Sequence, residues 1–458
     1  MKYFPSLIAS IFLVLSGCSS TTADDILETR VLSLNEFILV GDLKANPADP
    51  YLNVAPDGTI FLSWTEDSKD TEGRDAFIAS ASRKGLGKSR RMNDRPGQVH
   101  QYGGDNRTKF TVTPDGGIAA VWSATLPEYK TGEMRVTYAD EDGSFHPAVT
   151  LNDDGMPVNH AFGTIATSPN GKLYASWIDG RNRNFVGMAD PLSPAEARKD
   201  IKMKDLTIPE STMQMGPRQR KEYEHDNSQL MMAVSEDSGR TWGKNYPITG
   251  MKVCSCCVPN IAFLDRGETV VVSYRFVAED FLRDQVVVRS IDGGKTFSEP
   301  TYMSQDGWIA EFCPHAATSM ANDNQGKIHL AWFTAGRTDE ETGIYYTYSE
   351  DGGQSFAPRH LLSSTPPHTI LHAEVRADEN DTIWVAWENF VDNRPQIFLA
   401  HLDQDTGEWS KSHQVSDGTN NSILPMLAAG GDEVYVAWTE RKGETSKVRL
   451  RSATLARY

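Results

Sequence analysis

The sequence is poor in cysteine, in basic side chains and in long apolar runs. Five of its 458 residues are cysteines, and 45 lysines and arginines stand against 62 aspartates and glutamates. The formal charge of −17 argues against binding to nucleic acid and against adhesion to anionic lipid through a basic face. After the first 20 residues, no stretch is long and apolar enough to cross a bilayer as a helix. We therefore expect a globular body outside the bilayer.

The N-terminal segment has the features of an export signal. It carries one lysine, an apolar run over residues 7–15 and then small residues up to Cys18. The stretch LSGC resembles the bacterial lipobox, which implies that residues 1–17 are a cleaved lipoprotein signal peptide, that Cys18 is acylated, and that residues 18–29 form a lipidated tether. Ser19 follows the cysteine, which by resemblance to lipoprotein sorting in Gram-negative bacteria favours the outer membrane, facing the periplasm or the cell exterior. The alternative is an ordinary secreted protein that loses Cys18 with its signal.

Seven similar units follow the signal. Each contains a short apolar run, a turn signal such as PDG, PNG or NQG, and a second apolar run rich in β-branched residues. The second run ends in tryptophan in six units and in tyrosine in one, at Trp64, Trp122, Trp177, Tyr274, Trp332, Trp387 and Trp438. A variable polar stretch and a third apolar run come next. The pattern predicts antiparallel strands joined by tight turns.

The spacing of the seven aromatic positions reveals one insertion. Successive positions are 58, 55, 97, 58, 55 and 51 residues apart. The third interval is longer than its neighbours by roughly 40 residues, and the extra segment, at about residues 185–225, is rich in charge, methionine and proline. We expect a long surface excursion there and not an eighth unit.

A second motif recurs in register with the aromatic positions. Three segments fit the pattern Ser-x-Asp-x-Gly-x-Thr/Ser-aromatic. Aspartate and glycine favour a tight turn, hydroxyl groups hydrogen-bond the backbone locally, and the aromatic ring fills the space beneath the turn. The motif residues are Ser235, Asp237, Gly239 and Trp242, then Ser290, Asp292, Gly294 and Phe297, and finally Ser349, Asp351, Gly353 and Phe356.

These segments resemble the Asp boxes, or bacterial neuraminidase repeats, of the sialidase superfamily, and the resemblance covers nearly all of residues 30–458. It implies an all-β fold, a single β-propeller of four-stranded antiparallel blades with the Asp box between the third and fourth strands of a blade. Known sialidases have six blades, whereas the seven units here favour seven, with six blades and a separate module as the alternative. The last unit stops after its third strand, and we expect the run at residues 30–41 to supply the missing outer strand.

The resemblance also implies a glycosidase chemistry from which this sequence departs. The sialidases that it resembles hold the substrate carboxylate with three arginines, the first in an Arg-Ile-Pro motif, pair a tyrosine nucleophile with a glutamate, and use an aspartate as acid/base. The chain has no Arg-Ile-Pro motif, and no catalytic tyrosine can be placed by motif. Carboxylates such as Asp179, Glu311 and Glu388 are candidates for another glycosidase chemistry, which needs two acids a few ångströms apart.

The segments that lead into the blades carry most of the cysteine and much of the histidine. Within a unit the PDG-type turn joins the first two strands, so these leading segments share the opposite face of the ring, beside the central axis. We name it the axial face. Blade four is reached through Cys254, Cys256 and Cys257, and blade five through Cys313 and His315. Further candidates for ligand contacts on this face are His100, Tyr102, His160, Glu311, His368 and His372.

The four cysteines after Cys18 allow three states. Thiolates with imidazoles make good sites for copper or zinc, and a cysteine-rich shell favours copper(I). An even number of cysteines in an oxidising compartment also fits disulfides, with Cys313 linked to Cys254 or Cys256, and buried free thiols are the third state. His315, two residues after Cys313, is the best candidate imidazole because the two positions share one side of a strand. The spacing alone leaves metal and disulfide open.

Three functions follow for a cell-envelope lipoprotein of this kind. The main expectation is a Cys/His cluster on the axial face that binds copper or zinc, or shapes a pocket for a small molecule or glycan. The alternatives are an exo-acting glycoside hydrolase of sialidase type and a non-catalytic scaffold that binds carbohydrate or protein. The sequence leaves open whether the protein is an enzyme; an enzyme would be a glycosidase or a metal-dependent enzyme. We expect a monomer with no nucleic-acid partner.

Overall fold

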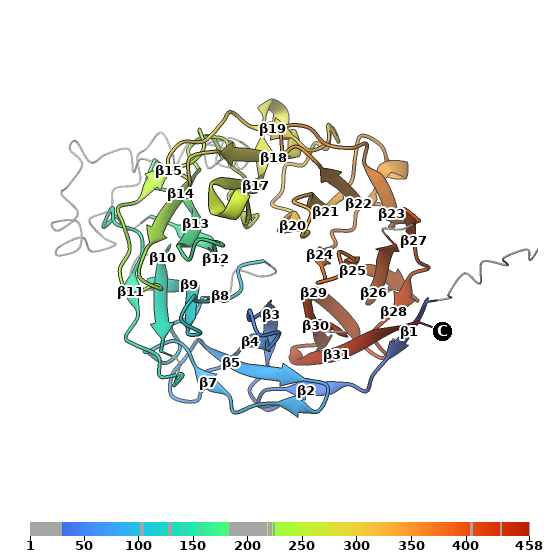
Figure 1. Cartoon of the computed structure of the whole chain (residues 1–458), viewed down its shortest axis with the longest axis horizontal. Coiled ribbons are helices and arrows are strands. Elements are labelled where there is room, and N and C mark those ends of the chain that lie inside the picture. The colour runs from blue at the N-terminus through green and yellow to red at the C-terminus, as the bar shows by residue number, and fades with distance from the viewer. Residues whose placement is uncertain are drawn as a thin grey trace, which may run out of the picture.

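The computed structural model is a ring of seven β-sheet blades around a central axis (Figure 1). It describes residues 30–100, 105–126, 131–140, 142–156, 158–182, 218, 222, 225–403, 406–430 and 433–457. Among these residues, no helix is long and apolar enough to cross a membrane. The prediction of an all-β propeller of four-stranded antiparallel blades is confirmed, and the ring has seven blades rather than six.

The blades follow the order of the chain, and in each blade the first strand lies nearest the axis (Figure 1). Blade one contains β3 (Ala48–Val54), β4 (Ile60–Asp67), β5 (Arg74–Ser82), β6 (Gly85–Leu86) and β7 (Arg90–Arg91). Blade two contains β8 (Lys109–Val112), β9 (Ile118–Leu126), β10 (Thr131–Ala139) and β11 (Val149–Thr150). Blade three contains β12 (His160–Thr167), β13 (Leu173–Asp179), β14 (Gln229–Ser235) and β15 (Tyr246–Pro247).

The remaining blades repeat the arrangement. Blade four contains β16 (Asn260–Leu264), β17 (Thr269–Val277), β18 (Arg283–Ser290) and β19 (Thr301–Tyr302), and blade five contains β20 (Ser319–Asn322), β21 (Ile328–Thr334), β22 (Gly343–Ser349) and β23 (His360–Ser364). Blade six contains β24 (Ala373–Ala377), β25 (Ile383–Val391), β26 (Arg394–Asp403), β27 (Glu408–Trp409) and β28 (His413–Gln414). Blade seven contains β29 (Asn421–Gly430), β30 (Glu433–Lys442) and β31 (Thr445–Arg457). Short 3-10 turns form at η2 (Asp265–Gly267), η3 (Glu279–Phe281) and η4 (Asp339–Glu341).

The two ends of the described chain meet in blade seven. Strands β1 (Arg30–Leu34) and β2 (Ile38–Val40) both pair antiparallel with β31, so that Leu32 lies opposite Leu455 and Leu39 opposite Arg449. The N-terminal run therefore supplies the outer strand that the seventh unit lacks, in two pieces, as the sequence predicted. These pairs link the start of the ring to its end through backbone hydrogen bonds.

Aromatic side chains of the second strands hold neighbouring blades together. The six repeat tryptophans and Tyr274 are at most 2 % exposed. Each tryptophan packs against the preceding blade, as Trp332 does against Val271, and Trp64 packs against Met426 of blade seven. Burial of one such side chain contributes roughly 4–6 kcal/mol at about 25 cal/mol per Å². The contact between the aromatic side chain of a second strand and the preceding blade thus joins neighbouring blades. At Trp64 the same kind of contact closes the ring.

The Ser-x-Asp-x-Gly segments form turns between the third and fourth strands of blades three, four and five. In the first, the Ser235 hydroxyl accepts a hydrogen bond from the Gly239 N–H (2.9 Å), and the Asp237 carboxylate accepts from the N–H and hydroxyl of Thr241 (2.8 and 2.6 Å). The same bonds recur around Asp292 and Asp351. These turns lie on the face opposite the axial face, so they serve the fold and not the candidate site.

A short segment before β8 fills the middle of the ring; we name residues 105–107 the central plug. Arg107 donates to the carbonyl of Pro50 (2.8 Å), the Asn106 side-chain oxygen accepts from the N–H of Phe162 (2.9 Å), and the Asp105 carboxylate accepts from the N–H of Ala317 (2.8 Å). These partners lead into or belong to blades one, three and five. The central plug therefore bonds to segments from around the ring and occupies its axis.

Several sequence predictions fall outside the described residues. They concern the signal peptide and tether at residues 1–29 with Cys18, Tyr102, and most of the insertion at about residues 185–225. His225, at the C-terminal end of the insertion, is described and buried.

The docking of β2 can be tested with one buried and one exposed side chain. Val40 is fully buried in the cluster that joins blades one and seven, whereas its neighbour Leu39 is 44 % exposed. We expect Val40→Ala to lower the free energy of unfolding by about 1–3 kcal/mol, because it leaves a cavity, and Leu39→Ala to change it by no more than about 0.5 kcal/mol. Urea denaturation measures both, and equal effects would contradict the docking of β2 in the core.

Candidate metal centre

The segment that leads into blade four folds into a tight loop against the second strand of that blade. The N–H of Cys254 donates to the carbonyl of Arg275 in β17 (2.9 Å). The chain then turns at residues 255 and 256 and runs on to β16. Because the chain reverses at the turn, the side chains of Cys254 and Cys257 come face to face although they are three residues apart.

Three sulfur atoms gather in this loop. The Sγ atom of Cys254 lies 3.5 Å from that of Cys256 and 3.6 Å from that of Cys257, and all three lie within 4.8 Å of one another. A disulfide bond is about 2.0 Å long, so these distances are those of separate thiols. The three side chains are 0, 3 and 1 % exposed in an apolar cluster that includes Phe162 and Val258. The arrangement could hold a metal ion.

A buried guanidinium lies against the first sulfur. Arg283, at the start of β18, is fully buried and donates to the sulfur of Cys254 (2.9 Å), to the carbonyl of Ala310 (2.6 Å) and to the imidazole of His225 (2.9 Å). No carboxylate of the described chain lies within ion-pair distance of it. A cation buried this deeply needs a counter-ion, and the Cys254 sulfur is the group in place to be one.

The three cysteines consequently differ in protonation. Burial alone would raise the pKa of Cys254, but hydrogen bonds with Cys256 and Cys257 and the charge of Arg283 hold it well below its usual value. Burial and the neighbouring Cys254 raise the pKa of Cys256 and Cys257. The lowered pKa favours the thiolate form at Cys254, and since metals bind that form, Cys254 is the cysteine best prepared to bind a metal.

The structure brings Cys313 to the cluster but places His315 elsewhere. Cys313 is partly exposed and its side chain interacts with that of Cys256. Residues 313–318 have no regular structure, β20 starts only at Ser319, and His315 has a φ of 51°. The expectation that Cys313 and His315 share one side of a strand is therefore wrong, because the strand begins later. The ring of His315 packs against Phe162 of blade three at 5.9 Å.

Sequence reasoning missed two members of this site. His225 belongs to the end of the insertion, and Arg283 starts the third strand of blade four, where an alternating strand pattern gives no reason to single it out. Their 58-residue separation hides the contact that they make. Because β18 also contains Asp284, Gln285 and Arg289, no signal in the sequence marks Arg283.

Two histidines of the axial face, His160 and His372, lie in ion pairs with carboxylates. The buried ring of His160 is 3.0 Å from Asp154 and 3.7 Å from Asp179, and these acids raise its pKa against the opposing effect of burial. Asp154, His160 and Asp179 are close enough together to suggest a metal site. Arg181, however, already donates to both oxygens of Asp179 at 2.9 and 3.0 Å, so cations of the protein neutralise this cluster.

His372 is also paired with a buried carboxylate. One ring nitrogen lies 3.1 Å from the buried carboxylate of Glu388, and the other donates to the carbonyl of His315 (2.9 Å). Although burial opposes it, the charge of Glu388 raises the pKa of His372 to about 9. The ring is an imidazolium at neutral pH and offers a metal no lone pair.

The other predicted ligand residues lie apart from the sulfur cluster. His100 bonds the hydroxyl of Thr125, and His368 is exposed on a surface turn. Glu311 is exposed and pairs with Arg218 of the insertion (3.0 Å). None of the three belongs to a group of potential metal ligands within the part of the chain that the structure describes.

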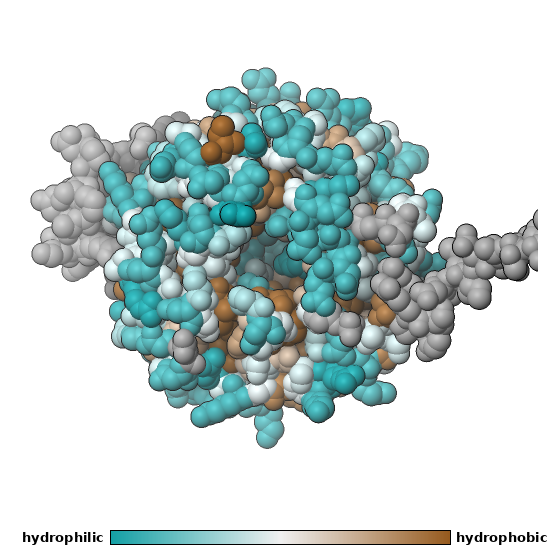
Figure 2. Space-filling model, in the orientation of Figure 1, coloured by the Kyte–Doolittle hydropathy of each residue, from teal (hydrophilic) through white to brown (hydrophobic). Residues whose placement is uncertain are grey.

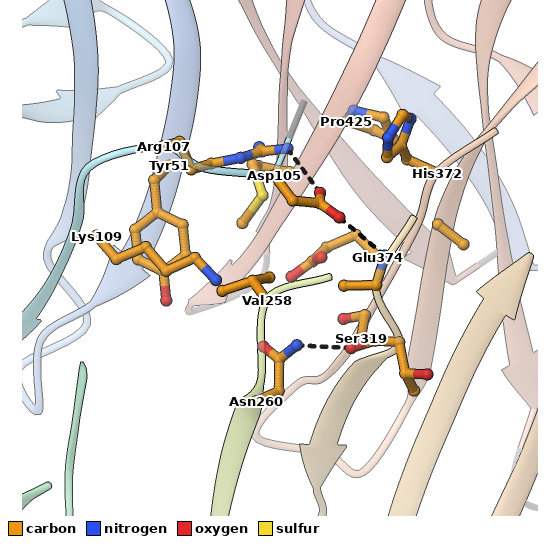
Figure 3. A pocket seen from close by; sticks show the side chains of 14 residues that line it. Tyr51, Asp105, Arg107, Lys109, Val258, Asn260, Ser319, His372, Glu374 and Pro425 are labelled. Atoms are coloured by element: carbon orange, nitrogen blue, oxygen red, sulfur yellow. Dashed lines mark hydrogen bonds and ion pairs between the residues drawn. The ribbon is translucent and has the colours of Figure 1, made fainter. Parts of the chain in front are cut away.

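A small cavity lies on the ring axis beside the central plug. Figure 2 shows one face of the ring, which is mostly hydrophilic and hollowed at its centre. The cavity has a volume of about 30 Å³ and is lined by charged and polar groups of several blades, among them Tyr51, Asp105, Arg107, Lys109, Asn260 and Glu374 (Figure 3). Burial lowers the pKa of Lys109 to about 8. The volume is enough for one or two water molecules.

Known structures share the ring and little of the sequence. The polysaccharide lyase Uly1 is 12 % identical, with a TM-score of 0.51 over 91 % of this chain and 92 % of that one. A protein of unknown function from Dyadobacter fermentans is 10 % identical, with a TM-score of 0.50 over 93 % and 99 %. The NanB sialidase of Streptococcus pneumoniae is 10 % identical, with a TM-score of 0.49 over 92 % and 95 %.

No family model matches the chain, and no curated protein is similar to it. The similar structures include sialidases, other propeller glycosidases and a polysaccharide lyase. At these identities the likeness shows the fold alone. The chemistry of the site depends on this chain's own residues and not on the shared fold.

The ion pair of His372 predicts a pH-dependent stability. Its pKa of about 9 in the folded protein lies above the ordinary value of 6.5, so the stabilisation is complete below pH 6.5 and is lost as the pH rises to 9. Relative to His372→Gln, we expect the free energy of unfolding to fall by roughly 1–3 kcal/mol over this window. Urea titrations across the window measure it. The exposed His413→Gln is the matched control, and the same slope in all three proteins would exclude the ion pair as the cause.

Proposed function

We propose that this protein is a cell-envelope lipoprotein whose sialidase-like propeller binds one soft metal ion, copper(I) or zinc, through Cys254, Cys256 and Cys257. The observation that carries the proposal is the gathering of three sulfur atoms within 4.8 Å of one another in a dry loop, with a guanidinium against one of them. Three converging thiols without a bound metal would be prone to oxidation in an exported protein.

The distances suit a metal with little rearrangement. Three thiolates bound at about 2.3 Å lie about 3.8–4.0 Å apart in tetrahedral or trigonal coordination. The two measured separations from Cys254 are 3.5 and 3.6 Å. The sulfurs would move outward by a few tenths of an ångström, which a loop can do without disturbing the blade.

The ligand set and the local charge favour a thiophilic ion. A cysteine-rich shell selects copper(I) or zinc over the harder divalent cations. Three thiolates around a monovalent ion leave two negative charges, and the guanidinium of Arg283 offsets one of them. A zinc site would take a fourth ligand, for which Cys313 and His225 are the nearest candidates, because each contacts a member of the cluster or its guanidinium.

The proposal also covers the location of the protein and the resemblance of its turns to Asp boxes. Acylation of Cys18 would tether the propeller to the outer membrane, and the three Ser-x-Asp-x-Gly turns have the hydrogen bonding that an Asp box requires. We propose a monomer, since the ring closes on itself and the acidic surface disfavours anionic partners. The metal would be acquired outside the cytoplasm.

A glycoside hydrolase has less support from the axial face. Sites for small ligands have volumes of about 300–1,000 Å³, whereas the axial cavity, which Asp105 and Arg107 of the central plug help to line, measures about 30 Å³. Asp105 and Glu374 face this cavity, but a sugar would have to displace the plug first. The metal site needs no such rearrangement.

The metal content of the wild-type chain tests the proposal. After purification without oxidant, we expect about one equivalent of copper(I) or zinc per chain, measured by inductively coupled plasma mass spectrometry, and a free-thiol titre that rises when the metal is removed. We expect Cys254→Ser to reduce metal binding by roughly 10–100-fold, since it removes the thiolate of the site.

A matched control separates the two groups of potential ligands. Asp154→Asn alters the acidic cluster around His160 and should leave the metal content unchanged, because Arg181 and His160 neutralise that cluster. Wild-type protein without metal and without titratable thiols would overturn the proposal in favour of disulfides. Equal metal loss in Asp154→Asn and Cys254→Ser would place the metal elsewhere.

A further inference from the structure

The cysteines around the proposed metal differ sharply in their access to solvent. Cys254, Cys256 and Cys257 are at most 3 % exposed, whereas Cys313 is partly exposed. A carrier molecule approaching from solvent therefore meets Cys313 before it meets the other three cysteines. It cannot reach the other three directly.

The far side of the cluster is closed by buried side chains. Arg283 is fully buried against Cys254, and His225, which accepts a hydrogen bond from Arg283, is 1 % exposed. Behind His225 lies the buried ring of Phe281, at 6.3 Å. A metal ion approaching from that side would have to pass the positive charge of Arg283. It would also have to displace buried side chains of the core.

The near side offers a continuous set of sulfur atoms. The side chain of Cys313 interacts with that of Cys256, and Cys256 lies 3.5 Å from Cys254. Cys313 itself stands in a stretch without regular structure and packs against the cluster that holds the other three cysteines. Sulfur therefore leads inward from the partly exposed Cys313 through Cys256 to Cys254.

We infer that Cys313 is the acceptor thiol that takes the soft metal ion from a carrier holding it through thiol or thioether sulfur, and passes it inward to Cys256 and Cys254. This inference rests on the proposed function, since it concerns loading of the same site. At the first step the bond between metal and carrier sulfur breaks and a bond to the Cys313 sulfur forms. The Cys313 proton goes to the released carrier thiolate or to water, and no electron changes hands.

We expect Cys313 to affect the rate at which the metal site is loaded and not the final amount of bound metal. The thiol-bound carrier can be represented by copper(I) supplied as its glutathione complex. Loading is followed in a stopped-flow instrument by the ultraviolet absorption of copper–thiolate bonds, and the end-point by metal analysis. We expect Cys313→Ser to load at least about tenfold more slowly than the wild type and to reach the same final stoichiometry.

Two further variants keep the test independent of folding. Cys313→Met retains a soft sulfur ligand for copper(I) and should recover part of the rate, which a purely structural role for the thiol would not produce. Cys18→Ser removes a cysteine outside the propeller and should change neither rate nor stoichiometry. The thermal midpoint of each variant, measured by circular dichroism, shows that the propeller is intact.

Each outcome separates this inference from the proposal beneath it. A wild-type chain that binds no metal overturns both, and is recognised before any variant is made. A wild type that loads normally with a Cys313→Ser variant of equal rate overturns the inference alone. A Cys313→Ser variant with a lower final stoichiometry makes Cys313 a permanent ligand and also overturns it.

Discussion

The whole molecule depends on closing the ring. A blade is a twisted sheet with two apolar faces, and each face must be covered by a neighbouring blade. The repeat tryptophans do this by packing on the preceding blade, and Trp64 makes the contact between blade one and blade seven. The pairing of β1 and β2 with β31 fixes that contact with backbone hydrogen bonds. Once the ring is closed, every segment that leads into a blade must pass near the axis on one face.

That geometry brings together residues that are far apart in the chain. Asp105 of the central plug bonds the backbone of residue 317, 212 residues away, and Cys313 meets Cys256. The blades supply a rigid frame, and the irregular segments between them supply the chemistry.

Charge divides the axial face into two kinds of site. His160 and His372 face carboxylates, which raise the pKa of both imidazoles and favour the protonated form that binds no metal. Cys254 faces two thiols and a guanidinium, which lower its pKa and favour the thiolate form that binds metal. The two arrangements follow the same rule, that a buried charge requires a buried partner of opposite sign. They differ in outcome because a carboxylate favours the protonated imidazole, which has no lone pair for a metal. A guanidinium instead favours the thiolate, which is the form of cysteine that binds metal.

The architecture could be predicted from the sequence. The period of the aromatic positions predicted the number of blades, the short last unit predicted closure by residues 30–41, and the turn positions predicted which face would gather the cysteines. These features follow from local rules of strand and turn formation that repeat along the chain. The contacts of the site could not be predicted in this way. The fold brings Arg283 and His225 to the cysteine cluster and places His315 away from it. It also leaves Cys313 as the one partly exposed cysteine of the four in the described chain. Such contacts join segments of different blades and the end of an insertion, and no local pattern records which side chains packing will bring together.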